Sequence, residues 1–458
     1  MMIGLGLLLS CLWAQAQLVA DSTLISPTPE TFEEAMTLLT YTGQDQAYED
    51  MQDTLNQTSN RVQASNDLTD NEARPKEDSE EESWLTGRTQ ISEGISNLGF
   101  SLLRKISMKH DNNVVFSPLS IAFALATLML GSKGQTRAEL ERGLGLQNLN
   151  RTEHLPQLFR QLRDTLSFNQ ELGLTQGSFA FIHKDFNARE TFLNLSRTYL
   201  DTQCVPVNFH NAPQARLFMN HYINKEAKGR IPQFFDEVNP STKFILVDYI
   251  LLRGKWLSPF DPTATEVDMF YLDKYQAVKV PMMFQAGKFA STFDKTFRCH
   301  VLQLPYRGNA SMLVILMENM GDHLALEDYL TPELVDKWLR TMKTREMEIY
   351  FPKFKLDQEY GLHKLLKQLG IREVFSTRAN LSEISATARD LRVSKVLQRT
   401  VFEVDEKGTD AVAGTQSQIT AYSMPPIIKL NRPFHFLIYE ETSRMLLFLG
   451  RVMNPTFP

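Results

Sequence analysis

The side chains that could carry out catalysis are scattered through this sequence of 458 residues. It lacks a G-x-S-x-G serine turn, an H-E-x-x-H zinc motif, a P-loop and a G-x-G-x-x-G dinucleotide loop. None of its nine histidines stands at metal-ligand spacing from a cysteine or carboxylate, and His435, between two phenylalanines of an expected strand, is interpreted as structural. The sequence therefore predicts no catalytic residues and no metal site. It contains no motif that would support a secreted hydrolase.

An unusual segment near the C-terminal end suggests a different chemistry. From Glu406 the sequence reads E-K-G-T-D-A-V-A-G-T, continues with polar residues to Ser423, and ends in Met424, Pro425 and Pro426. Small residues followed by a Pro-Pro pair are typical of an exposed loop. In the first part of the segment, alternate positions are all small: Thr409, Ala411, Ala413 and Thr415. As a strand, the same segment could bury one face in a crowded sheet, so both a loop and a strand remain open to it.

Apolar periodicity from Ile91 to the end of the chain indicates one large domain that would hold this segment. Residues 121–130 are apolar on all sides, as in a fully buried helix, and residues 155–166 carry an apolar stripe at helical spacing. β-Branched and aromatic residues predict the following strands: 311–317, 347–356, 400–405, 434–439 and 445–452. Because helices predominate early and strands late, the predicted fold class is α+β.

The first 88 residues differ from the rest. An apolar run followed by a small-x-small pattern at Ala14–Ala16 predicts a secretory signal peptide over residues 1–20, cleaved after residue 16 to 20. Residues 17–88 hold sixteen acids and four bases, whereas the whole chain has a net charge of −6. We expect residues 21–88 to form a disordered acidic tail, either a solvated spacer or an arm that meets a basic surface. The summed charge gives no reason to expect nucleic-acid binding.

The cysteine and asparagine residues fit a secreted protein. Cys204 and Cys299 remain after the signal peptide, and these two either pair or stay free. No later stretch is apolar for long enough to cross a bilayer. Five Asn-x-Ser/Thr triplets could carry glycans: Asn56, Asn150, Asn194, Asn309 and Asn380.

The segment that begins at Glu406 resembles the hinge of the serpins, serine-protease inhibitors whose cleaved loop inserts into their own main sheet. Further blocks match the same family: Val115–Ser120, Gly229–Pro232, Gly254–Trp256, Pro259–Phe260, Val280–Met283 and Asn431–Phe436. The resemblance covers nearly all of Ile91–Pro458. It implies a serpin domain over residues 89–458, with three β-sheets, eight or nine helices and an exposed reactive-centre loop.

The resemblance also implies how the protein works. A target protease would attack the carbonyl of Tyr422, fourteen residues after the hinge glycine, and cleave the bond to Ser423 through an acyl-enzyme. The freed loop would insert into the main sheet and distort the protease before deacylation. The implied hinge residues are Gly408, Thr409, Ala411, Ala413 and Thr415. Asp248 and Gln398 stand where many serpins have Asn and His beneath that sheet, and this difference bears on how readily the sheet opens.

The resemblance is strongest to a plasma member of the family, and it implies partners. Tyr422 suits a chymotrypsin-like pocket, whereas factor Xa prefers Arg, so inhibition of factor Xa would require a cofactor. The implied cofactor is protein Z, acting with calcium and phospholipid, and factor XIa is a second implied target. Contact with a membrane would be indirect, through protein Z. The implied protein Z face comprises Met108, Asp111, Asp273, Tyr275 and Asp328.

Basic residues on consecutive expected helices suggest a heparin site, as in other serpins. They are Lys133, Arg137, Arg142, Arg151, Arg160 and Arg163. Acids at Glu139, Glu141 and Glu153 interrupt this patch. The expected function is a serine-protease inhibitor that is secreted into plasma and acts in blood coagulation. Two alternatives stay open: a non-inhibitory carrier or chaperone, and an inhibitor of a chymotrypsin-like protease. The small residues at alternate hinge positions favour inhibition, because a carrier has no need of them.

Overall fold

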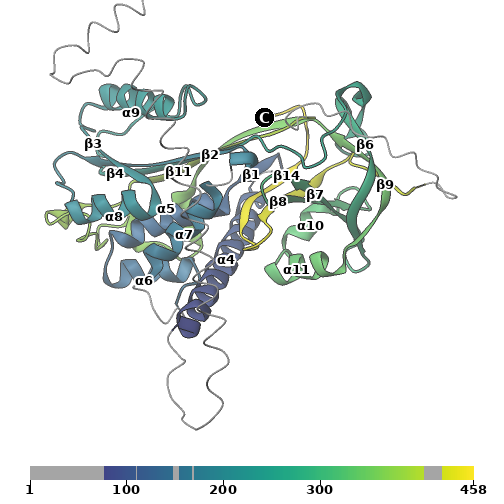
Figure 1. Cartoon of the computed structure of the whole chain (residues 1–458). Coiled ribbons are helices and arrows are strands. Elements are labelled where there is room, and N and C mark those ends of the chain that lie inside the picture. Colours follow the sequence, from purple (N-terminus) through teal and green to yellow (C-terminus); the bar gives the residue numbers. More distant parts are fainter. Residues whose placement is uncertain (1–76, 110, 148–153, 168–169, 407–424) are drawn as a thin grey trace, which may run out of the picture. The chain divides into compact units, whose positions relative to one another are not determined.

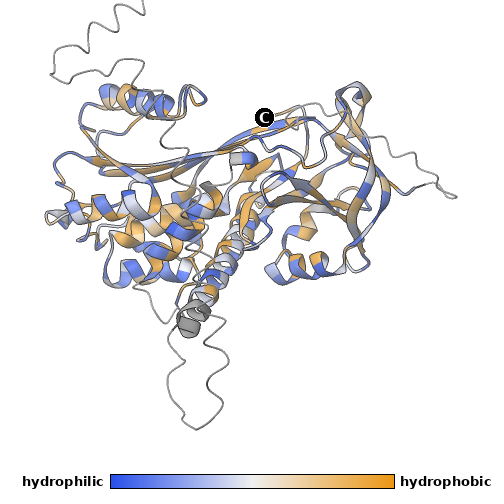
Figure 2. Cartoon of the chain, viewed as in Figure 1, coloured by the Kyte–Doolittle hydropathy of each residue, from blue (hydrophilic) through white to orange (hydrophobic). Residues whose placement is uncertain are grey.

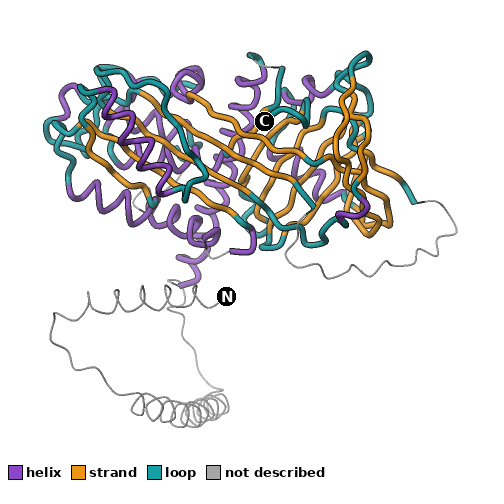
Figure 3. Tube along the Cα trace, turned by 90° about the horizontal axis from the view of Figure 1, so that it is seen from above, coloured by secondary structure: helices purple, strands orange, loops and turns teal. Residues whose placement is uncertain are grey.

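Two β-sheets and the helices that cover them make up this computed structural model, which describes residues 77–109, 111–147, 154–167, 170–406 and 425–458 (Figure 1). All of these residues belong to one compact unit, Lys76–Pro458. Within them, no helix is both long enough and apolar enough to cross a membrane. The strands of both sheets are drawn in orange in Figure 3.

The smaller sheet has five strands, and the segment that begins at Glu406 leaves from it. In spatial order the strands are β10 (Phe354–Gly361), β11 (Lys395–Val404), β4 (Phe244–Leu252), β2 (Leu174–His183) and β3 (Thr202–Val207). β11 and β4 are parallel, and their register runs from Lys395 opposite Ile245 to Phe402 opposite Leu252. β10 and β2 flank this pair and are antiparallel to it. Every residue of β4 is buried, because both faces of the sheet are covered.

The larger sheet has nine strands among the described residues. In order they are β1 (Val114–Phe116), β14 (Leu446–Val452), β13 (Phe434–Glu440), β8 (Ala310–Met317), β7 (Cys299–Tyr306), β6 (Ala277–Asp294), β9 (Lys343–Pro352) and β12 (Ile427–Lys429), with β5 (Glu266–Tyr271) paired to β6. β6 has 18 residues, so it pairs with β5 at its beginning, with β7 at its end, and with β9 between. Continuous hydrogen bonding therefore joins the strands of an expected third sheet to this one. The described residues contain two sheets, not the three that the resemblance implied.

The described residues contain nine α-helices, within the expected number. They are α4 (Glu77–Ser107), α5 (Pro118–Leu130), α6 (Gly134–Gly143), α7 (Leu155–Ser167), α8 (Glu190–Leu200), α9 (Ala212–Glu226), α10 (His323–Glu327), α11 (Pro332–Thr341) and α12 (Leu362–Gln368). α5 begins where the Ser117 hydroxyl accepts a hydrogen bond from the Ser120 amide (3.1 Å) and Pro118 opens the first turn. Its residues from Pro118 to Met129 are all buried, which confirms the helix expected from its apolar sequence.

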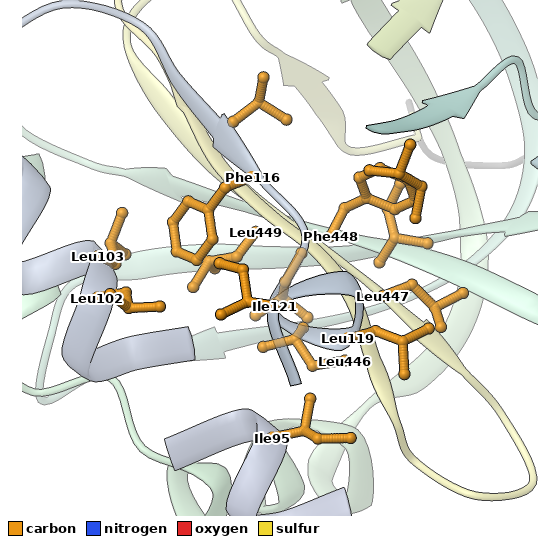
Figure 4. Packing of buried hydrophobic residues seen from close by; sticks show 14 of the residues in the cluster. Ile95, Leu102, Leu103, Phe116, Leu119, Ile121, Leu446, Leu447, Phe448 and Leu449 are labelled. Carbon is orange, nitrogen blue, oxygen red and sulfur yellow. The ribbon is translucent and has the colours of Figure 1, made fainter. Parts of the chain in front are cut away.

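Hydrophobic side chains fill both faces of the five-stranded sheet. Leu246 and Ile250 of β4 belong to the larger cluster, which includes α5, whereas Val247 and Leu251 belong to a second cluster that includes α9. The two helices accordingly lie on opposite faces of this sheet (Figure 1). Apolar residues are dense along α5 (Figure 2). Figure 4 shows the larger cluster where α4, α5 and β14 meet, with Phe448 among its side chains.

Most of the strands predicted from sequence are confirmed, and two boundaries differ. Residues 347–356 read as one strand, but β9 ends at Pro352 and β10 begins at Phe354, each in a different sheet. α4 begins at Glu77, inside the segment 21–88 that the sequence assigned to the tail. The remainder of that tail and the signal peptide lie outside the described residues. The observed class is α+β, as the sequence predicted.

Candidate functional site

The base of the segment that begins at Glu406 is held by side chains from distant parts of the chain. Asp405 follows β11, and its carbonyl oxygen accepts a hydrogen bond from Nε1 of Trp256 (2.9 Å). The Glu406 carboxylate accepts from the Thr265 hydroxyl (2.9 Å) and lies 2.7 Å from the Lys353 ammonium. Burial acts to raise the pKa of Glu406, but these hydrogen bonds outweigh it and hold the pKa below its usual value. The carboxylate is therefore charged at neutral pH and fixes the start of the segment.

Trp256 is itself held by close aromatic packing. Its ring stacks on that of Tyr306, with centroids 4.3 Å apart and planes at 11°. Gly254 lies against the same tyrosine, and a Cβ there would stand 2.5 Å from a carbon of the Tyr306 ring. Arg253 reaches the carboxylates of Asp405 (3.4 Å) and Glu403 (3.6 Å). The block Gly254–Trp256, noted in the sequence as part of the resemblance, thus supports the base of the loop.

The far end of the segment enters the other sheet. The Pro426 carbonyl oxygen accepts a hydrogen bond from the Glu348 amide (3.0 Å), and β12 then pairs in parallel with β9. Lys429 of β12 makes an ion pair with Asp268 of β5. Residues 407–424 therefore connect two different sheets. They lie outside the described residues, and so do the predicted reactive bond and the predicted hinge positions: Tyr422, Ser423, Gly408, Thr409, Ala411, Ala413 and Thr415.

The contact between β11 and β4 is the place where the five-stranded sheet could accept another strand. The two strands are parallel and far apart in sequence, and their ladder joins eight residue pairs. We call this contact the β4–β11 seam. A chain that turned back at the end of β11 would run antiparallel to both strands, so it could make the stronger antiparallel ladder on each side. Insertion would thus replace one parallel ladder by two antiparallel ones.

A buried polar pair lies in the middle of the seam. Asp248 of β4 stands opposite Gln398 of β11. The Gln398 side chain accepts from the Ser117 amide (3.2 Å) and donates to the Ser117 carbonyl oxygen (2.9 Å), so it is tied to the residue that caps α5. Asp248 is buried, and its Oδ2 has no hydrogen-bond partner among the described residues. Burial raises the pKa of Asp248 to about 8, with partial opposition from Ser178, so this acid is mostly protonated at neutral pH.

Most of the predicted heparin-binding residues are paired with acids. The pairs are Lys133 with Glu383, Arg137 with Glu141 (2.7 Å), Arg160 with Asp164 (3.5 Å) and Arg163 with Asp164 (2.8 Å). Arg142 is exposed on α6, and Arg151 lies outside the described residues. Because each acid cancels a nearby positive charge, α6 and α7 offer a polyanion less attraction than their basic residues alone would suggest.

The residues predicted to face protein Z are all at the surface. Tyr275 is 94% exposed, and Asp273 shapes the turn beneath it by accepting hydrogen bonds from the amides of Tyr275 (2.6 Å) and Gln276 (2.8 Å). This turn joins β5 to β6. Met108, just after α4, is 78% exposed, and Asp111 and Asp328 are also exposed. An exposed aromatic side chain on an ordered turn is a suitable anchor for a protein partner.

A buried ionic cluster lies directly behind part of this surface. Glu327, next to Asp328, accepts from Nη1 of Arg451 (2.7 Å) and lies 2.7 Å from Nε2 of His435. Arg451 also donates to the carbonyl oxygen of Asn112 (3.1 Å), the neighbour of Asp111. Burial acts to raise the pKa of Glu327, but His435 and Arg451 hold it below its usual value. One charged cluster thus fixes the backbone beside two residues of the predicted protein Z face, and His435 has a structural place in it.

The predicted glycan acceptors differ in their surroundings. Asn194 and Asn380 are exposed, whereas Asn56 and Asn150 lie outside the described residues. Asn309 is exposed, but its Nδ2, the atom that would carry a glycan, donates hydrogen bonds to Glu440 (2.6 Å) and Thr442 (2.7 Å). A glycan there would replace one of these protons, so one of the two bonds would be lost.

The two cysteines that the sequence left open are both free. Cys299 is fully buried in β7, and Cys204 is half-buried in β3. Burial raises the pKa of both thiols to about 12, so neither is a thiolate at neutral pH. Neither has the character of a reactive cysteine.

Two residues at the loop base were missed by sequence reasoning. Lys353 lies where β9 and β10 adjoin, but Glu348 and Lys355 of the same stretch are charged too, so nothing marked Lys353 as a partner of Glu406. Thr265 gave no signal, because it meets Glu406 from 141 positions away in the chain. The positions beneath the seam were identified from the resemblance, and the structure places Asp248 and Gln398 in register there.

Comparisons with known proteins agree on the family. A model described as serpin (serine protease inhibitor) matches residues 93–455. Human protein Z-dependent protease inhibitor is 68% identical over 379 residues, which cover 82% of this chain and 85% of the human one. The crystal structure of mouse protein-Z dependent protease inhibitor matches with a TM-score of 0.77 and 61% identity, covering 82% of this chain and 100% of that one. Human thyroxine-binding globulin matches with a TM-score of 0.73 and 31% identity, covering 81% and 100% of the two chains.

Proposed function

The chain belongs to the serpin family, and from this premise we propose that it is a secreted plasma inhibitor of serine proteases and not an enzyme. The observation that supports the proposal most directly is the β4–β11 seam, because the segment after Glu406 departs from one of its two strands. A strand formed by that segment would place its small side chains, at alternate positions, toward one buried face. Loop insertion therefore has both a donor segment and an acceptor site in this chain.

The reaction begins as ordinary proteolysis. The serine hydroxyl of the target attacks the carbonyl of Tyr422, an ester forms, and the amide bond to Ser423 breaks as the new amine takes up a proton. The loop then inserts into the seam and carries the tethered protease with it. Distortion of the protease stops hydrolysis of the ester. The intact inhibitor is accordingly a metastable state that cleavage releases.

The partners we propose are factor Xa and factor XIa as targets, with protein Z, calcium and phospholipid as the cofactor system. Relatives that are more than 60% identical over the aligned residues are named for their dependence on protein Z. Tyr422 suits an apolar pocket, so unaided inhibition of a protease that prefers Arg would be slow. A cofactor that holds both proteins on one membrane surface compensates through high effective concentration. The exposed Tyr275 turn, with Met108, Asp111, Asp273 and Asp328, is the proposed protein Z face.

Complex formation tests this proposal. The purified protein is mixed with factor Xa, with and without protein Z, calcium and phospholipid, and with chymotrypsin as a control, and the products are separated on denaturing gels. A covalent band with factor Xa that depends on protein Z is the expected result. A band with chymotrypsin alone would keep the mechanism but reject the target. An intact or merely cleaved loop, with no band, would favour a carrier.

Hinge variants test the insertion step. Ala411→Arg places a long charged side chain on the proposed buried face, so insertion should slow and the variant should be cleaved as a substrate. Val412→Arg is the matched control, because this neighbour points to the opposite face of a strand. We expect the control to trap protease with the stoichiometry of the wild type. If Ala411→Arg also did so, the assignment of the buried face would be wrong.

Heparin is a secondary partner in this proposal. The cations of α6 and α7 would attract the polyanion, but the acids paired with them weaken that attraction. We therefore expect binding that is weak at physiological salt and falls steeply as salt rises. Retention on immobilised heparin at increasing salt measures it. No retention at low salt would remove heparin from the proposal.

A further inference from the structure

Three side chains of metal-binding types meet at one edge of the five-stranded sheet, away from the loop. His183 is the last residue of β2, Asp185 lies in the turn that follows, and His210 lies between β3 and α9. One ring nitrogen of each histidine and one carboxylate oxygen of Asp185 all lie within 4.8 Å of one another. The sequence did not reveal this group, because His210 follows His183 at a distance typical of no metal motif.

The topology of the sheet explains why these residues meet. β2 and β3 are parallel, with His183 opposite Val207, so both strands end at the same edge. The Lys184 amide donates to the Val207 carbonyl oxygen (3.0 Å), which holds the two connecting turns together. The rings of His183 and His210 consequently lie close, with centroids 4.6 Å apart and planes at 67°.

His183 is a buried side chain whose position suits a metal ligand. It is 2% exposed, so the surrounding side chains restrict the positions that its ring can adopt. Its Nδ1 accepts from the Asp185 amide (3.3 Å) and lies 3.6 Å from the Asp185 carboxylate.

The other nitrogen of the same ring is unsatisfied. Nε2 of His183 is buried and has no hydrogen-bond partner among the described residues, which is unusual for a buried polar atom. A half-turn of the ring about Cβ–Cγ exchanges each nitrogen with a ring carbon, so Nε2 would take the place of Cε1, the atom bonded to Nδ1. A metal ion would give the ring a second strong partner that the protein alone does not supply.

We propose that His183, Asp185 and His210 form a binding site for a zinc-class transition metal ion. Two imidazoles and one carboxylate match the ligands that zinc takes, with a water molecule completing four-coordination. Zinc requires ligand atoms at about 2.0 to 2.2 Å, so the two exposed side chains, Asp185 and His210, must draw toward the buried one. Asn211, the residue after His210, caps α9. A bound ion would therefore fasten the start of α9 to the end of β2.

Metal titration of the full-length protein tests the site. The chain is first stripped with a chelator, and Zn²⁺ binding is then measured by calorimetry, with Co²⁺ absorption in the visible range as an independent report of four-coordination. His210→Ala removes an exposed ligand and should leave the fold intact. His221→Ala, an exposed histidine of α9 outside the group, is the matched control.

We expect the wild type and His221→Ala to bind one more equivalent of Zn²⁺ than His210→Ala does, or to bind it at least tenfold more tightly. Asp185→Asn should weaken binding less than the loss of an imidazole. Zn²⁺ should also raise the unfolding midpoint of the wild type and of His221→Ala, but not that of His210→Ala, since a ligand of the native state stabilises it. Equal stoichiometry and affinity in the wild type and His210→Ala, or no tetrahedral Co²⁺ spectrum in the wild type, would overturn the proposal.

Discussion

Replacement of Asp248 by Asn tests whether a buried acid sets the strength of the β4–β11 seam. Asp248 stands opposite Gln398 in the seam, and burial raises its pKa to about 8. An unfolded chain loses this proton near pH 4, so between about pH 4 and pH 8 the native state binds one proton more than the unfolded state. Stability should therefore fall as the pH rises through this window and level off above it.

The size of the effect follows from the linkage relation. A difference of one bound proton changes the free energy of unfolding by about 1.4 kcal/mol per pH unit, or about 4 kcal/mol between pH 5 and pH 8. With an unfolding entropy of about 2.1 cal/mol/K per residue, this corresponds to about 5 °C in the unfolding midpoint of a domain of this size. Asp248→Asn keeps the shape of the side chain but does not titrate, so the variant should lack this slope. At pH 5 it should match the wild type within about 1 to 2 kcal/mol, because its extra amide proton needs an acceptor.

The assay is the unfolding midpoint of both proteins between pH 5 and pH 8, scanned at one fixed rate because the proposed mechanism makes the native state metastable. The midpoint of the variant should rise relative to that of the wild type as the pH rises. Asp336→Asn, which changes an exposed acid of α11, controls for the loss of a negative charge. If the curves of Asp248→Asn and the wild type ran parallel across this range, the buried acid would not be protonated in the native state and the reasoning would fail.

The other contacts of the site lead to smaller or more local effects. Glu406→Gln removes the charge that meets Lys353 and should lower stability by about 1 to 2 kcal/mol at neutral pH. Since the pKa of Glu406 is depressed, this difference in stability should disappear as the pH falls through that pKa. Glu403→Gln is the control: its ion pair with Arg253 is exposed and longer, so this variant should change the unfolding midpoint little. Glu327→Gln breaks a buried pair and should cost about 3 to 5 kcal/mol by chemical denaturation. Asp328→Asn should leave stability unchanged while weakening protein Z binding, and equal stability losses in both variants would contradict the assignment. The two free cysteines should react with a thiol reagent only on unfolding, and rapid labelling of the native protein would show that their burial is overstated.

Sequence periodicity predicted the elements better than their assignment to sheets. Residues 347–356 are rich enough in apolar and aromatic residues to read as a single strand, yet the chain leaves one sheet at Pro352 and enters the other at Phe354. The apolar positions shift in phase between Phe351 and Phe354, but spacing cannot show which sheet each strand joins, because that depends on its partners. Three sheets were expected from the resemblance and not from spacing. The length of β6 allows it to pair on several sides, and such pairing is a tertiary property that spacing does not reveal.

The candidate site was predictable where it depends on spacing and unpredictable where it depends on contact. The alternation of small residues after Glu406 is visible in the sequence, and so are the pairs Arg137–Glu141 and Arg160–Asp164, which are four residues apart on helices. The Lys133–Glu383 pair and the Lys353–Glu406 pair join distant parts of the chain and carry no local signal.

In the proposed mechanism, opening of the β4–β11 seam is limited by a barrier and not by the final balance of hydrogen bonds. An inserted strand would restore a ladder on each side of the seam, so the opened and filled sheet would have more backbone hydrogen bonds than the closed one. The closed state persists because its two strands cannot separate without disturbing both faces of the sheet. On one face Gln398 is bound to the cap of α5, and on the other Leu397 packs in the cluster that contains α9. Contacts that fasten α5 or α9 to the sheet should therefore slow insertion, whereas the inserted strand itself determines how far the product is stabilised.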